Sequence, residues 1–172
     1  MSTVMDAKQR EVFLADVHVG VLSVASASGA PKAPLTVPVW YRYEPGGDVV
    51  CVMGRDSRKA RLIEIAGEFS LCAQEEVEPY RYVSVQGPAT VVHDGGNMAE
   101  HRALAHRYLE PDAAEHYLSG ADFDLSATVT VRMRPSRWYS ADFSRMPPVG
   151  GSDHETAPPS PQHVRSPESV DR

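Results

Sequence analysis

The chain alternates short apolar runs with glycine- and proline-containing turns, and this alternation limits the folds open to it more than any other feature. Most of these runs follow one another through turns, with only a few short helical segments between them. Such an order is typical of antiparallel sheets, because parallel strands need long crossover connections. We therefore predict a mainly β (α+β) fold, an antiparallel barrel of six to seven strands with short peripheral helices. The expected strands are 17–27, 31–44, 48–53, 69–74, 80–93, 127–134 and 138–143.

Three prolines interrupt the run 31–44, and each removes a backbone N–H that a central strand would need. We expect this run at an edge, at a bulge, or where its backbone serves something other than a neighbouring strand. A closed barrel would cover such an edge. The expected helices are an N-terminal one capped by Ser2 or Thr3, 57–67, 97–108 with an Asn97–Glu100 capping box, and 112–120 with an Asp112–Glu115 box.

Length, charge and cysteine content narrow the class of protein. The 172 residues suffice for one domain with a real core, and the net charge of −6 argues against a general nucleic-acid binder. Cys51 and Cys72 lack the spacing of a metal site or redox pair, so we predict buried free thiols and no metal. The polar N-terminus and short apolar runs predict a cytoplasmic protein without a membrane segment. We expect a domain over 1–144 and a disordered Pro/Ser-rich tail over 145–172.

A cluster of cations at the expected start of helix 57–67 is the strongest functional signal. Arg55, Arg58, Lys59 and Arg61 crowd the first turn, where the helix dipole already favours negative charge. Free backbone N–H groups, the Ser57 hydroxyl and these cations together suit a phosphate group. A solvated basic helix start is the structural alternative. The pattern predicts a phosphate-binding site.

Four segments in a fixed order resemble a known family. They are VPVWYRY at 37–43, SRK at 57–59, FSLCAQ at 69–74 and YRYVSVQGPATV at 80–91. The order is similar to that of the pyridoxamine 5'-phosphate oxidase-like split β-barrel proteins, the flavin and deazaflavin oxidoreductases. The resemblance covers residues 11–143, which is nearly all of the expected domain.

The resemblance implies a homodimer that holds its cofactor in a groove between subunits. Ser57 and Lys59 would bind the cofactor phosphate, assisted by Arg58 and Arg55, and the backbone of Val37, Pro38, Val39 and Trp40 would lie beside the tricyclic ring. Tyr82 and Trp138 would reach the site from the partner chain, although plain packing explains Trp138 at least as well.

The cofactor expected from the resemblance is F420 or FMN. The cluster at 57–59 would suffice for the single phosphate of FMN, whereas the longer tail of F420 would need further basic groups such as Arg55, Arg61 and Lys32. Pyridoxamine phosphate oxidation is not favoured, because a second phosphate site is missing. Heme is a weaker option, since its candidate ligands are better explained as surface or interface side chains; they are His93, His101, His106 and His116.

The expected function is an oxidoreductase that uses F420 or FMN for hydride transfer to a small conjugated or aromatic substrate. The sequence singles out no catalytic acid or base, so the substrate proton would come from solvent or a tyrosine. The alternative is a non-catalytic flavin- or heme-binding carrier protein.

Overall fold

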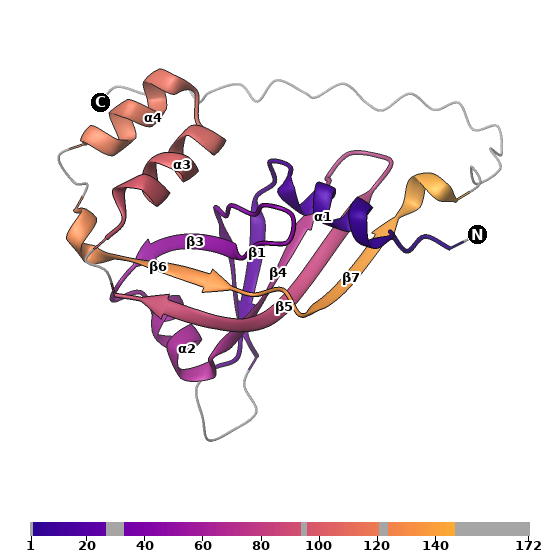
Figure 1. The fold of residues 1–172 in the computed structure, drawn as a ribbon, viewed down its shortest axis with the longest axis horizontal. Helices are drawn as coiled ribbons and strands as arrows, with labels where there is room; N and C mark the ends of the chain where they lie inside the picture. Colours follow the sequence, from indigo (N-terminus) through magenta and orange to yellow (C-terminus); the bar gives the residue numbers. More distant parts are fainter. Residues whose placement is uncertain (1, 27–32, 94–95, 121–123, 147–172) are drawn as a thin grey trace, which may run out of the picture.

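The computed structural model describes residues 2–26, 33–93, 96–120 and 124–146, which form one curled sheet with helices around it (Figure 1). The described residues contain seven strands, four α-helices and two short 3-10 helices. In chain order the elements are α1 (Ala7–Ala15), β1 (Gly20–Val24), β2 (Leu35–Val39), β3 (Val49–Gly54), α2 (Arg58–Ala66), β4 (Glu68–Gln74), β5 (Arg81–Val92), α3 (Met98–Tyr108), α4 (Pro111–Ser119), η1 (Leu125–Ala127), β6 (Thr128–Met133), β7 (Arg137–Asp142) and η2 (Phe143–Arg145).

The strands form an antiparallel sheet in the order β2-β1-β4-β5-β6-β3, with β7 paired to β5. The 12-residue strand β5 connects the two parts of the sheet. Its first half pairs with β4 on one side and β7 on the other, and its second half, Ala89–Val92, pairs with β6. The sheet therefore curls into a half-barrel, which confirms the predicted mainly β, antiparallel barrel class.

Gly87 lies where the partner of β5 changes from β7 to β6. The chain between those two strands crosses so close that a Cβ atom on Gly87 would lie 1.9 Å from the Arg134 carbonyl oxygen. The neighbouring residues hold this crossing: the Arg134 N–H donates to the Pro88 carbonyl (2.9 Å) and the Ser136 N–H donates to the Gln86 carbonyl (3.0 Å). Glycine is required here because any side chain would strike backbone.

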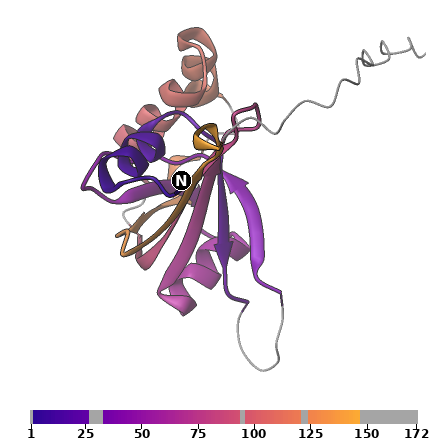
Figure 2. The same cartoon turned by 90° about the vertical axis from the view of Figure 1, so that its right-hand side faces the viewer.

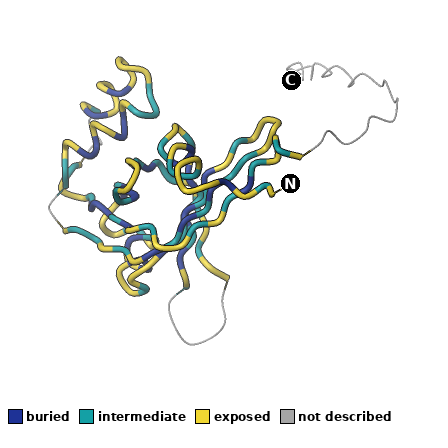
Figure 3. The backbone as a smooth tube through the Cα atoms, turned by 45° about the vertical axis from the view of Figure 1, so that its right-hand side comes forward, coloured by how far each residue is buried: buried dark blue, intermediate teal, exposed yellow. Residues whose placement is uncertain are grey.

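The main apolar core lies within the curl of the sheet, where much of the chain is buried (dark blue in Figure 3), and a second, smaller cluster lies between α3 and α4. Phe13 and Leu14 of α1 and Leu62 and Ile63 of α2 are all buried in this core. Helix α2 ends as expected at Gly67, whose φ of 67° is the left-handed conformation that favours glycine. The amphipathic pattern of α2 thus buries its apolar side while Arg58 and Arg61 stay exposed.

The proline-containing strand lies at an edge of the sheet, which was one of the three positions expected for it. β2 ends the sheet order and pairs along its length with β1 (Figure 2). We expected a closed barrel to cover this edge. In the described residues, the barrel closes here only through an isolated β-bridge just after β2. There the N–H and carbonyl of Arg42 both bond to Val50 of β3, at 2.8 Å each. β2 therefore keeps an open edge beside that bridge.

Several expected boundaries were wrong, among them those of the second strand, which spans Leu35–Val39 within the expected run 31–44. Three of the others have a clear physical cause. Asp6, with Gln9, caps α1 in place of Ser2 or Thr3, because each side chain accepts the other residue's N–H. The first strand starts only at Gly20, since the His18 carbonyl accepts a hydrogen bond from the Tyr108 hydroxyl (2.7 Å) outside the sheet. Helix α4 begins with Pro111, whose fixed φ suits the first helical position.

One expectation about the end of a helix was partly right. Asn97 caps α3 by accepting the Glu100 N–H, but the Glu100 carboxylate binds arginines of the barrel in place of closing the capping box. Arg145, the first residue after the expected domain 1–144, donates to the Val4 carbonyl and to the Gln9 side chain. Residues 147–172 lie outside the described part.

We predict that Gly87→Ala lowers the free energy of unfolding by about 3 kcal/mol, because the added methyl group forces the two backbones apart. Urea denaturation of the full chain measures this difference. Gly54→Ala is the matched control, since a Cβ there would lie 3.9 Å from its nearest neighbour and should change stability by less than about 1 kcal/mol. Equal effects of the two substitutions would contradict the assigned role of the crossing.

Candidate functional site

An open groove of about 470 Å³ brings the expected ring-binding segment and the expected phosphate-binding helix together. Two parts of the chain that the sequence analysis selected independently, Pro38–Trp40 and Lys59, thus face one space. Val37, in the same strand, pairs with Leu22, and its side chain points to the other face of the sheet from that of Pro38. The residues lining the groove are Val19, Pro38, Val39, Trp40, Val52, Lys59 and Tyr117.

Trp40 forms the aromatic wall of this groove. Its ring stacks on Tyr108 of α3, with centroids 5.0 Å apart and planes within 6°, and meets Tyr117 of α4 at 5.8 Å. The Tyr108 hydroxyl accepts the Tyr41 N–H (3.0 Å) and lies 2.9 Å from the Tyr41 carbonyl. Because the Tyr41 N–H is satisfied outside the sheet, the chain can turn here without leaving that donor unpaired. The groove is therefore bounded by a fixed aromatic cluster.

The start of α2 has the features of an anion site. Ser57 is the N-cap as predicted, and its hydroxyl oxygen accepts the Ala60 N–H at 3.3 Å. The N–H groups of Arg58 and Lys59 belong to the first turn, so they have no intrahelical acceptor. The Ser57 hydroxyl hydrogen also remains available as a donor. These donors, together with the positive end of the helix dipole, suit a phosphate oxygen.

The four cations of this helix start have different surroundings. Lys59 lines the groove and is partly buried, whereas Arg58 is exposed. Burial raises the pKa of the Cys51 thiol to about 12, and the nearby Lys59 charge opposes that rise. Arg55 donates to the Ser126 carbonyl, and Arg61 lies 3.5 Å from Asp56. Lys59 is thus the cation directed into the groove; Lys32 lies outside the described residues.

Tyr82 and Trp138 lie apart from this groove within one chain. Tyr82 is half-buried on β5, opposite Gln74 on one side and Ala141 on the other. Trp138 packs against the core, meeting Tyr43 edge-on at 6.0 Å, with the Arg10 guanidinium 5.0 Å above its ring. Their expected contact with a cofactor held by the partner chain stays a prediction.

Three of the four histidines considered for heme have side-chain partners in the described structure. His93 lies 2.8 Å from Glu64, buried His101 lies 3.0 Å from the Thr128 hydroxyl, and His106 lies 2.9 Å from Glu115. None of the three lines the groove. In the part of the chain that is described, there is also no group of three or more His, Cys, Asp or Glu residues that could hold a metal ion.

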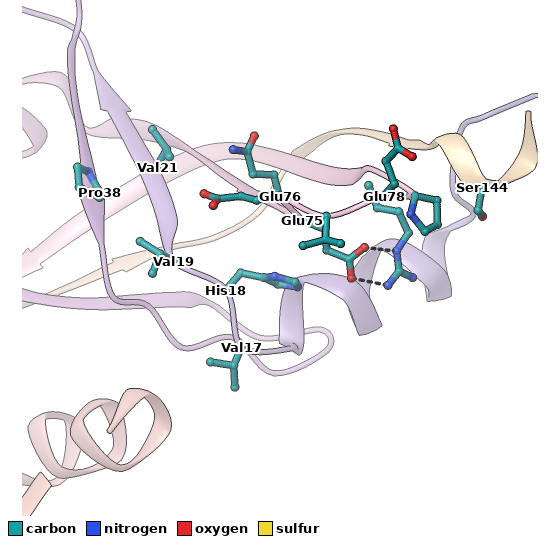
Figure 4. Close-up of a pocket in the computed structure, with 13 residues that line it drawn as sticks. Val17, His18, Val19, Val21, Pro38, Glu75, Glu76, Glu78 and Ser144 are labelled. Atoms are coloured by element: carbon teal, nitrogen blue, oxygen red, sulfur yellow. Dashed lines mark hydrogen bonds and ion pairs between the residues drawn. The ribbon is translucent and has the colours of Figure 1, made fainter. Parts of the chain in front are cut away.

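A larger cavity of about 870 Å³ lies beside the groove and shares Val19 and Pro38 with it. In Figure 4 the labelled side chains surround one opening, with apolar residues of β1, β2 and the segment before β1 facing the acidic turn between β4 and β5. The apolar side consists of Val17, Val19, Val21 and Pro38, and the acidic side of Glu75, Glu76 and Glu78.

His18 forms part of this larger cavity, and sequence reasoning had missed it. Its ring stacks on Phe13 with centroids 4.4 Å apart, one ring nitrogen bonds to the Phe13 carbonyl, and Nε2 is shielded from solvent with no hydrogen-bond partner in the described residues. Burial lowers the pKa of His18 below its ordinary value; the charges of Asp16 and Glu75 oppose this effect without reversing it. His18 is therefore neutral near pH 7.

Sequence reasoning also missed three residues of the groove: Val19, Val52 and Tyr117. Val52 is a strand residue, and alternation along 49–53 could have shown only that it faces away from Cys51 and Met53. Tyr117 belongs to a helix far along the chain, and no local signal brings it to Trp40. The groove therefore depends on contacts between distant segments.

Comparison with protein-family models identifies the class. Residues 6–139 match the model for pyridoxamine 5'-phosphate oxidase, which covers most of the chain. The protein belongs to the pyridoxamine 5'-phosphate oxidase family, as the order of its segments had predicted. No curated protein matches the chain.

Solved structures with the same fold include proteins that are named for different cofactors. An F420 reductase is 22% identical over 75% of this chain and 94% of its own, with a TM-score of 0.62. A conserved hypothetical protein from Mycobacterium tuberculosis is 20% identical over 88% of this chain and 96% of its own, with a TM-score of 0.60. An FAD- and heme-binding protein from Mycobacterium smegmatis is 14% identical over 82% and 73%, with a TM-score of 0.62. At these identities the likeness shows the fold.

The described helices are all too short or too polar to cross a membrane. The nine-residue helix α2, for example, carries four charged side chains along one face and its ends.

We predict that His18 makes the protein more stable as pH rises toward neutrality. Because the folded-state pKa lies below 6.5, the unfolded chain binds a proton first as pH falls, and stability is lost between 6.5 and the lowered pKa. Thermal unfolding at about pH 5.5 to 7.5 should show this slope, and His18→Gln should reduce it. His106→Gln, at a half-exposed site, is the control. An unchanged slope in His18→Gln would contradict the burial argument.

Proposed function

We propose that this protein is an oxidoreductase that binds F420 or FMN in the groove between Trp40 and the start of α2. The single observation that carries the proposal is that Lys59 lines the same groove as Pro38, Val39 and Trp40. A cation and free helix N–H groups at one end suit a phosphate, and an apolar and aromatic wall at the other suits a planar ring. Membership of the pyridoxamine 5'-phosphate oxidase family supports the flavin-type cofactor.

The phosphate and the ring of the cofactor would bind to different segments of the chain. The phosphate is held by the N–H groups of Arg58 and Lys59, the Ser57 hydroxyl and the Lys59 ammonium, with Arg58 and Arg55 adding charge. The ring lies along the backbone of Val37–Trp40, where the open edge of β2 leaves backbone groups available to bond a ligand. The bound flavin or deazaflavin supplies the hydride chemistry.

The chain itself contributes binding and orientation. The aromatic cluster fixes one wall of the groove, and Lys59 fixes the phosphate end, so the ring is positioned with one face toward the open side. A small conjugated or aromatic substrate would approach that face. The second candidate, a non-catalytic flavin or heme carrier, is favoured by the FAD- and heme-binding protein of the same fold. Turnover of a reducible substrate distinguishes the two candidates.

The choice between FMN and F420 depends on how far along α2 the ligand extends. Arg61 lies one turn beyond Ser57 and is only loosely paired with Asp56, at 3.5 Å. A single phosphate at the helix start would leave Arg61 free of contact, whereas a longer anionic tail could reach it. Arg61→Ala should therefore weaken F420 binding more than FMN binding.

We further propose that the working unit is a cytoplasmic homodimer with the cofactor at the subunit interface. The outer face of β4, β5 and β7 supports this, because a row of paired residues across these strands is incompletely buried. Its small and aromatic side chains suit a second copy of the chain. The row is Cys72, Ser84 and Tyr139.

We expect Lys59→Ala to weaken cofactor binding by about 1.5–3 kcal/mol, the range for hydrogen bonds to charged groups. Titration of the full chain with FMN and with F420, followed by fluorescence, measures this loss. Lys8→Ala, which removes an exposed charge on α1, is the control and should leave both affinities unchanged. If Lys59→Ala retains full affinity for both cofactors, the site assignment fails.

We expect Tyr139→Glu to weaken self-association by about tenfold or more, because it would bury an unpaired charge in the proposed interface. Sedimentation equilibrium of the wild type and the variant measures the difference. Ile65→Glu is the control, since Ile65 is 69% exposed on α2, outside the proposed interface, compared with 55% for Tyr139. A monomeric wild type, or equal association of all three proteins, would refute the proposed interface.

A further inference from the structure

We propose that the larger cavity beside the cofactor groove binds a small organic cation that has an apolar body. The assignment of this ligand as the substrate rests on the proposed function, while its binding does not. The structure offers three independent supports: an exposed apolar wall, a facing wall with uncompensated negative charge, and direct continuity with the groove.

The apolar wall is unusually exposed for branched hydrophobic side chains. Val17 is 58% exposed, Val19 is 52% exposed, and Val77, across the opening, is 77% exposed. Single apolar residues on a surface are common, but several lining one concavity mark a place where a ligand removes them from water. Burying them against a hydrocarbon body would gain hydrophobic free energy.

The opposite wall carries three carboxylates, and the arginine beside them neutralises only one. Arg81 binds Glu75 through two hydrogen bonds, of 2.7 and 2.5 Å, and this contact lowers the pKa of the Glu75 carboxyl. Glu76 and Glu78 line the same cavity and have no ion-pair partner among residues 2–26, 33–93, 96–120 and 124–146. The cavity is therefore negative near its opening, and this favours a cation.

His18 leaves this charge balance intact. Its imidazole is neutral near pH 7 for the reason given above, so the floor of the cavity adds no positive charge. The charged groups closest to it are Asp16, Glu75 and Arg107, of which the first two are negative. A ligand with a positive head and an apolar body thus complements both walls, whereas an anion would face Glu76 and Glu78.

The position of the cavity connects it to the proposed chemistry. Val19 and Pro38 line both spaces, so a molecule in the cavity would border the strand on which the cofactor ring is proposed to lie (Figure 4). A cation held at Glu76 and Glu78 would place its apolar body along Val19, toward Pro38. This arrangement assigns the charged head of the substrate to the turn between β4 and β5.

The test compares three ligands of one skeleton with the full chain in the absence of cofactor: 1-naphthylmethylamine, 1-naphthylmethanol and 1-naphthoic acid. Isothermal titration should give the tightest binding for the amine and the weakest for the acid, with the preference for the amine decreasing between about 0.05 and 0.5 M salt. The variant E76Q/E78Q should bind the amine about fivefold more weakly and the alcohol equally well. Val19→Ser should weaken both.

The control variant E68Q/E110Q removes the same number of exposed charges from sites outside the cavity and should bind the amine as the wild type does. Equal binding of amine and alcohol, no binding of the amine, or an unchanged E76Q/E78Q variant would overturn the proposal. A cavity filled by a second copy of the chain would also overturn it, and then E76Q/E78Q would alter self-association in place of amine affinity. Retained FMN or F420 binding in that case would leave the proposed function standing.

Discussion

The chain turn at Trp40, Tyr41 and Arg42 is the constraint on which the rest of the structure depends. Each of these consecutive residues is bound to a different part of the molecule. Trp40 stacks on Tyr108, the buried Tyr41 hydroxyl donates to the Leu14 carbonyl of α1, and the Arg42 backbone bridges to β3. Buried polar groups at a turn must find partners, and these partners come from three separate elements. The turn therefore joins both parts of the sheet and two helices.

The same turn also holds α3 beside the groove, because Arg42 forms an ion pair with Glu100 of that helix. Glu100 is only 8% exposed and binds Arg42 at 2.9 Å and Arg132 at 2.7 Å. Burial alone would raise the pKa of the Glu100 carboxyl, but the two arginines outweigh it and the pKa is lowered. A buried carboxylate with two charged partners has few alternative positions. The aromatic wall of the groove thus owes its position to an ion cluster on the other side of the turn.

Local signals succeeded where a short stretch of chain contains its own stabilising contacts. Ser57 and Gly67 mark the two ends of α2 correctly because capping depends on neighbours within one helical turn. The prolines of the run 31–44 predicted an edge as one of three alternatives, and β2, which contains Pro38, lies at an edge. The predicted Asp112–Glu115 capping box was wrong. Pro111 occupies the first helical position of α4, and Glu115 binds Arg102 and His106.

Local patterns in the sequence predicted the class of fold, the helix that presents Lys59 and the family, and they included an edge among the alternatives for the second strand. Each of these rests on periodicity, turn chemistry or the order of segments along the chain. Only the tertiary structure decided that Tyr117 meets Trp40, that Arg55 turns to the Ser126 carbonyl, and that valines before β1 face the acidic turn after β4. These pairs lie many residues apart, and their meeting depends on how the curled sheet packs, which no local pattern specifies.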